Sequence, residues 1–110
     1  MEDKIRDEFY RKIGKTFKAH RKAKHWSQQQ LSEKVSISQG YMSEIEKGVT
    51  RMPLDVYMDL CNALGIAPQD MLEIKDHSIK PELLTSIAKM KRSEQEDLFK
   101  AYEVFIKHTN

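Results

Sequence analysis

The stretch from Trp26 to Gly48, WSQQQLSEKVSISQGYMSEIEKG, decides how this chain folds. Ser27 is a good N-cap, because a serine hydroxyl accepts a hydrogen bond from an early helical N–H. Gln30 follows three residues later and completes a capping box. Ser38 caps a second helix, and Gly48 ends that helix as a left-handed residue. Two short helices joined by a tight turn predict a helix-turn-helix.

The composition indicates an all-α protein. The chain has 110 residues, few glycines and prolines, and no alternation of polar and apolar residues typical of strands. It has no apolar run long enough to span a membrane and no secretory segment, so we expect a cytoplasmic protein. Cys61 is the single cysteine, which excludes an internal disulfide, and its apolar neighbours predict a buried small residue.

Charge is unevenly distributed along the chain. Residues 1–26 hold nine Lys and Arg against four Asp and Glu, a net charge of +5. Residues 53–77 hold one Lys against five acidic residues, a net charge of −4. A molecule polarised in this way is suited to binding a polyanion on one side.

The segment before the helix-turn-helix reads as one helix over residues 1–25. Its apolar residues recur every four positions: Ile5, Phe9, Ile13 and Phe17. After the helix-turn-helix, Pro53 opens a fourth helix, Gly65 stops it, and residues 68–73 form a short fifth. The fourth helix has an apolar face made of Leu54, Tyr57, Leu60, Cys61 and Leu64.

The last third of the chain is predicted to be a helical hairpin over residues 77–110. Its second helix starts at a capping box of Ser93 and Glu96. The apolar face of that helix has no evident partner in residues 10–74 and consists of Leu98, Phe99, Tyr102, Phe105 and Ile106. We expect this face to form a dimer with a second copy. The alternative is that the tail packs back on its own domain, against Ile5 and Phe9.

The residues from Ser27 to Gly48 follow the pattern S-Q-x-x-L-x-x-K-V-x-I-S-x-x-Y-M-S-x-I-E-x-G. This pattern resembles the Cro/phage-repressor (XRE-type) helix-turn-helix family of transcriptional regulators. The resemblance covers about residues 10–74 and implies a five-helix, repressor-like DNA-binding domain in residues 1–76. Ser36 replaces the family's usual turn glycine, which predicts a turn with a strained or altered backbone. Gly40 leaves a usual base-contacting position without a side chain.

The resemblance also implies which residues meet double-stranded DNA in the major groove. They are Gln28, Ser38, Gln39, Gly40, Tyr41, Ser43, Glu44, Thr50 and Arg51. Gln39 is the leading specificity residue, since the glutamine amide can form two hydrogen bonds to one adenine, at N6 and N7. Two roles are open for Glu44: it accepts from cytosine N4, or it faces a lysine and touches no DNA. Tyr41 either contacts the sugar-phosphate backbone or covers the core.

Two further implications concern structure and assembly. The resemblance implies a buried ion pair of Arg21 and Glu46 that locks the first helix to the recognition helix. Some small repressors of this family carry a two-helix tail for self-association and for binding an antirepressor. We therefore expect a homodimer, with a regulatory protein partner at the tail as a further possibility.

The sequence thus predicts a DNA-binding transcriptional regulator, a repressor that binds a two-fold symmetric operator. Two alternatives stay open: an antitoxin or antirepressor-controlled interaction module whose tail binds a partner protein, and a nonspecific nucleoid-type binder. Enzyme chemistry is not expected, because the sequence has no phosphate-binding glycine loop, zinc-ligand spacing or nucleophile motif. No catalytic residue, metal or cofactor is predicted.

Overall fold

The computed structural model describes residues 2–72, 98, 99 and 102. This part of the chain contains no strand, which confirms the all-α class. Its five helices are α1 (Glu2–Ala23), α2 (Gln28–Lys34), α3 (Gln39–Lys47), α4 (Leu54–Leu64) and α5 (Pro68–Met71). The hairpin predicted for residues 77–110 lies outside the described residues, apart from positions 98, 99 and 102.

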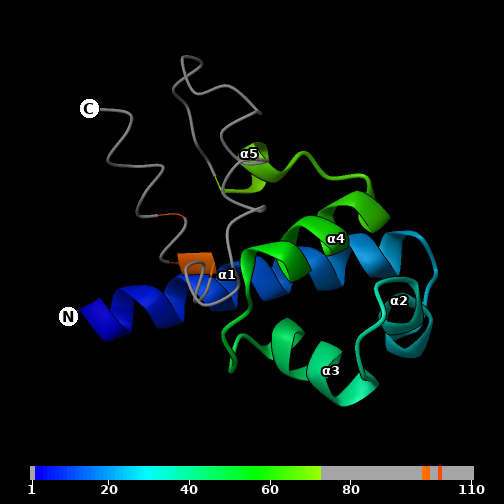
Figure 1. The fold of residues 1–110 in the computed structure, drawn as a ribbon, viewed down its shortest axis with the longest axis horizontal. Helices are drawn as coiled ribbons and strands as arrows, with labels where there is room; N and C mark the ends of the chain where they lie inside the picture. The colour runs from blue at the N-terminus through cyan, green and yellow to red at the C-terminus, as the bar shows by residue number, and fades with distance from the viewer. Residues whose placement is uncertain (1, 73–97, 100–101, 103–110) are drawn as a thin grey trace.

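The long helix α1 runs through the middle of the molecule, with α4 beside it and α2 and α3 at its carboxyl-terminal half (Figure 1). The core lies between these helices. Its most deeply buried side chains include Phe17, Leu31, Met42, Ile45, Leu54, Tyr57, Leu60 and Cys61. Every residue of the predicted apolar face of α4 is buried, which confirms that face.

Local capping fixes the ends of α2 and α3. The hydroxyl of Ser27 accepts from the backbone N–H of Gln30 at 3.0 Å, and the Gln30 amide oxygen accepts from the Ser27 N–H at 2.7 Å. Ser38 accepts from the N–H of Tyr41 at 3.1 Å. Gly48 ends α3 with a φ of 73°, the left-handed conformation that glycine adopts without steric cost. All three predicted caps are confirmed.

The turn between α2 and α3 is strained, as the serine at its centre predicted. Ser36 has a φ of 59°, a region that residues with a side chain rarely adopt. The turn is held because the N–H of Ile37 donates to the carbonyl of Ser32 at 3.0 Å. His25 has a φ of 60°, which the sequence did not indicate, and α1 accordingly ends at Ala23 rather than at residue 25.

The crossing of α1 over α3 depends on Gly14. A Cβ atom built on Gly14 would lie 2.3 Å from the carbonyl oxygen of Ile45 and 2.7 Å from that of Glu46. These atoms belong to the backbone of α3, so they cannot move aside as the end of a flexible side chain would. The missing side chain of Gly14 therefore sets how closely the two helices approach.

Gly14→Ala should lower the free energy of unfolding by about 1–3 kcal/mol, the usual cost of overpacking, although alanine is the better helix former. Gly40→Ala is the matched control, because a Cβ at Gly40 meets nothing within 4 Å. That control should be neutral or gain up to about 1 kcal/mol. Urea unfolding followed by circular dichroism measures both changes, and equal stabilities of the two variants would contradict the close approach.

Three residues of the tail lie against α1 and the loop after α3. The N–H of Leu98 donates to the carbonyl of Met52 at 2.6 Å, and that of Phe99 donates to the hydroxyl oxygen of Tyr10 at 3.0 Å. The rings of Phe99 and Tyr102 have their centroids 5.2 and 5.0 Å from that of Phe9. These three tail residues therefore contact their own domain, which is the alternative to dimerisation given above.

The remaining predicted tail contacts are only partly described. Ile5, named with Phe9 as the docking surface, is 58% exposed. Phe105 and Ile106 lie outside the described residues. The dimerisation role assigned to residues 98–106 therefore stays a prediction, and Leu98 and Phe99 contribute at least to the core of a single chain.

Candidate nucleic-acid interface

Helix α3 is attached to the domain by one face and exposed on the other. Met42, Ile45 and Glu46 are buried, and they pack the helix against α1 and α2. The opposite face is open to solvent, and α3 lies at the rim of the molecule (Figure 1). Three of the residues predicted to meet DNA, Ser38, Gln39 and Glu44, have exposed side chains, and Ser43 is half-buried.

The start of α3 is the most accessible part of this face. Gln39 is the first residue of the helix, directly after its N-cap, and it is exposed. Gly40 follows with open space where a side chain would stand. Together they leave the first turn of α3 uncovered, so that a second molecule can approach the backbone closely.

Tyr41 ties the start of α3 to the loop that follows the helix. Its hydroxyl donates to the carbonyl of Arg51 at 3.3 Å, and its ring is half-buried against the core. The hydroxyl of Thr50 donates to the same carbonyl, also at 3.3 Å. Tyr41 thus packs against the core, and its contact with the sugar-phosphate backbone stays a prediction. Arg51 itself is exposed at the end of the loop.

A buried network holds α3 to α1 and α2. Arg21 donates from Nε to Oε2 of Glu46 at 2.7 Å and from Nη2 to Oε1 at 3.1 Å. The side chains of Arg21 and Glu46 are only 9% and 2% exposed. Two parallel bonds between a guanidinium and a carboxylate form a strong, directional pair. The ion pair implied by the family resemblance is therefore present.

Two neighbours extend this network. Arg21 Nη1 donates to the carbonyl of Trp26 at 2.7 Å, which fixes the chain between α1 and α2. Gln28 Nε2 donates to Oε1 of Glu46 at 3.0 Å. No local sequence pattern predicts this second bond, because Gln28 and Glu46 belong to different helices. It places the Gln28 side chain at the junction of α2 and α3.

Cys61, the single cysteine, is buried in the core and interacts with Tyr57. Burial raises the pKa of the Cys61 thiol to about 12, and a hydrogen bond with Tyr57 offsets part of that rise. A thiol of such high pKa stays protonated at neutral pH and is a poor nucleophile. Within the part of the chain that the structure describes, no three His, Cys, Asp or Glu are grouped to hold a metal ion, and no helix is long and apolar enough to cross a membrane.

Comparison with known proteins agrees with this geometry. A family model described as a Cro/C1-type HTH DNA-binding domain matches residues 18–77, which is more than half of the chain. The chain belongs to the Cro/C1-type helix-turn-helix family. This Cro/C1-type protein is thus a DNA-binding regulator by family, and α3 is the second helix of its helix-turn-helix. A search of curated proteins found no match.

Solved structures of regulators share the fold of this Cro/C1-type protein. The restriction-modification controller protein C.AhdI from Aeromonas hydrophila is 27% identical, with a TM-score of 0.54, over 56% of this chain and 94% of its own. The clp gene regulator ClgR from C. glutamicum is 26% identical, with a TM-score of 0.55, over 66% and 95% of the two chains. A complex of the SinR and SinI proteins, at 23% identity and a TM-score of 0.52, shows likeness of fold alone.

Proposed function

We propose that this protein is a sequence-specific transcriptional repressor that binds a two-fold symmetric operator as a homodimer. The observation that carries the proposal is the exposure of Gln39, Gly40 and Glu44 on a helix whose other face is locked into the core. A recognition helix needs both properties, because its side chains must reach base edges from a fixed position.

Each exposed residue has a role in this proposal. Gln39 reads a base through its amide, and Ser43 and Glu44 reach the groove from the next turn. Gly40 lets the helix backbone come close to the DNA. Phosphate and sugar contacts, which set the register on the duplex, come from Gln28, Ser38, Tyr41, Thr50 and Arg51.

Selection of bound sites from a random duplex library at a stated salt concentration tests the proposal. A dimer that presents two copies of α3 should select two inverted half-sites, with centres about 10–10.5 base pairs or a multiple apart. One asymmetric half-site would contradict the homodimer. No enrichment over random sequence would contradict sequence-specific binding and favour a nonspecific binder.

Gln39→Ala should weaken binding to the selected site by about 1–3 kcal/mol and relax the preference at one base position. Gln29→Ala is the matched control, since Gln29 is an exposed glutamine of α2 whose side chain donates to Glu33 at 3.2 Å. The control should bind as the unmodified protein does. Repeating the selection with each variant measures the preference. An equal loss of affinity on every sequence would contradict a base-reading role for Gln39.

A further inference from the structure

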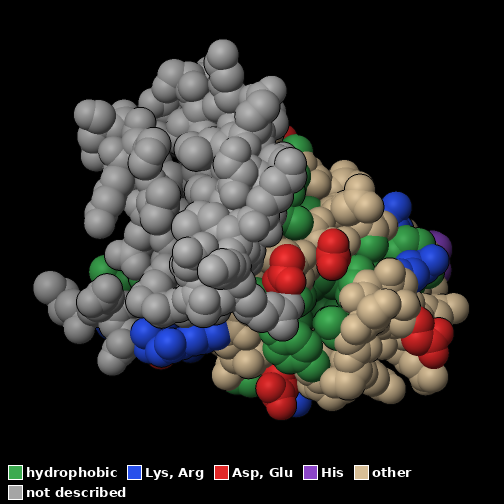
Figure 2. Space-filling view, in the orientation of Figure 1, with side chains coloured by type: hydrophobic (Ala, Val, Ile, Leu, Met, Phe, Trp, Pro, Cys, Tyr) green, Lys and Arg blue, Asp and Glu red, His purple; other side chains and the backbone are tan. Residues whose placement is uncertain are grey.

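A pocket of about 260 Å³ lies between the amino-terminal half of α1 and the loop from α3 to α4. Its α1 wall consists of Arg6, Asp7, Tyr10 and Arg11, and its other wall consists of residues 48–51. With Arg51, the lining contains three arginines and one acidic residue. In the space-filling view, Lys and Arg side chains gather beneath this half of α1 (Figure 2).

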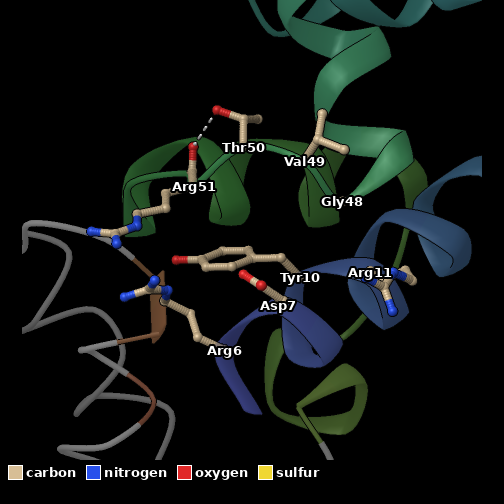
Figure 3. A pocket seen from close by; sticks show the side chains of 8 residues that line it. All are labelled: Arg6, Asp7, Tyr10, Arg11, Gly48, Val49, Thr50 and Arg51. Carbon is tan, nitrogen blue, oxygen red and sulfur yellow. Dashed lines mark hydrogen bonds between the residues drawn. The ribbon is translucent and has the colours of Figure 1, made fainter. Parts of the chain in front are cut away.

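Two of the arginines converge. In the view of Figure 3, the guanidinium groups of Arg6 and Arg51 both lie toward the Tyr10 hydroxyl, although they come from opposite walls, and that hydroxyl also accepts the N–H of Phe99 at 3.0 Å. Arg11 extends on the other side of the Tyr10 ring, and the Asp7 carboxylate lies beneath that ring in this view. Arg6 and Arg51 both have other partners, but two planar guanidinium groups in the lining of one pocket still favour a phosphate, because each presents several N–H donors in a fixed fork.

The pocket has a fixed position relative to α3. A Cβ built on Gly48 would lie 2.4 Å from the Cα of Arg11, so the two backbones are in direct contact. The N–H of Val49 donates to the carbonyl of Glu44 at 3.2 Å, which ties the start of the loop to α3. The pocket therefore keeps a fixed position relative to α3.

We propose that this pocket binds a backbone phosphate of the DNA, beside the bases that α3 reads. The inference rests on the proposed function and adds to it. Arg6, from the part of α1 that precedes the family match at residues 18–77, becomes a DNA-binding residue. It shares one phosphate with Arg51 of the loop.

The test measures the affinity of the selected duplex, with about ten base pairs of flanking sequence (one helical turn), across a series of KCl concentrations. Each phosphate neutralised by the protein contributes about 0.9 to the slope of log affinity against log salt. Arg6→Gln should reduce the slope by up to about 0.9, whereas Arg6→Lys should keep most of it. Asp7→Asn should strengthen binding at low salt, because it removes the negative charge that lines the pocket.

Lys12→Gln is the matched control. It removes one positive charge from the same helix, at a position that does not line the pocket and lies about 120° around the helix from Arg6. Its slope should equal that of the unmodified protein. The double variant Arg6→Gln/Arg51→Gln should lose no more slope than one shared phosphate contributes, so the two effects should not add.

Two outcomes separate this proposal from the function on which it rests. If Arg6→Gln leaves the slope unchanged while Gln39→Ala relaxes specificity, the pocket does not bind DNA phosphate and the proposed function stands. If random-library selection yields no preferred site, the proposed function itself is wrong. If Arg6→Gln and Lys12→Gln reduce the slope equally, the effect is one of general charge, and the pocket is excluded as a specific phosphate site.

Discussion

Glu46→Ala should lower the free energy of unfolding by about 3–5 kcal/mol, the typical effect of removing one partner of a buried ion pair. The side chain of Arg21 is 9% exposed and would be left without its two bonds to the carboxylate. Gln28 would lose its acceptor at the same time. Arg21→Ala should be comparably damaging, because it leaves the Glu46 carboxylate, 2% exposed, without its counter-charge. Urea unfolding measures each change.

The double variant Arg21→Ala/Glu46→Ala distinguishes a real pair from two independently important residues. Its loss of stability should be smaller than the sum of the two single losses, with a coupling energy of about 0.5–3 kcal/mol. Glu33→Ala serves as a control, since Glu33 is exposed on α2 and its carboxylate accepts a hydrogen bond from the Gln29 side chain at 3.2 Å, away from the buried pair. Additive effects of the two substitutions would contradict the pair.

Phe99→Ala should destabilise the protein by about 3–5 kcal/mol, the usual effect of truncating a buried phenylalanine. Phe99 is 7% exposed, and its ring packs edge-on against that of Phe9. Leu98→Ala, at a fully buried position, should cost about 2–5 kcal/mol. Ile5→Ala is the control, because Ile5 is an exposed apolar residue of the same helix that carries Phe9. It should change stability little.

Unfolding these variants at several protein concentrations distinguishes docking within one chain from exchange of tails between two chains. If the tail docks within its own chain, Phe99→Ala should lower the unfolding midpoint by the same amount at every protein concentration, whether or not the protein is a dimer. If two chains exchange their tails, the substitution should also weaken association, so the size of its effect should depend on protein concentration. An unchanged stability of Phe99→Ala would contradict the docked position of the tail altogether.

Truncation after Asp76 examines the whole tail. It removes Leu98 and Phe99 from the core and exposes Phe9, so the shortened domain should be less stable. If the tail forms the dimer, the shortened domain should also be a monomer. Light scattering on the intact and shortened chains reports the assembly directly. A dimer that becomes a monomer places the interface in the tail, two monomers contradict the proposed homodimer, and two dimers place the interface in residues 1–76.

The sequence by itself determined the features that depend on neighbouring residues. The caps at Ser27 and Ser38 and the left-handed end at Gly48 each follow from a side chain and a backbone group a few residues away. The apolar face of α4 follows from helical periodicity. The strained turn at Ser36 was indicated because a serine stands where the family has glycine.

Only the tertiary structure decided the features that join distant parts of the chain. The bond from Gln28 to Glu46 and the convergence of Arg6 with Arg51 link helices or loops whose separation no local pattern encodes. The docking of Phe99 against Tyr10 spans 89 positions. An apolar helix face shows that a side chain must be buried, but hydrophobic burial is non-directional, so the face alone does not choose between its own domain and another chain. The contacts of Phe99 with Phe9 and Tyr10 show which surface covers this residue in the folded chain.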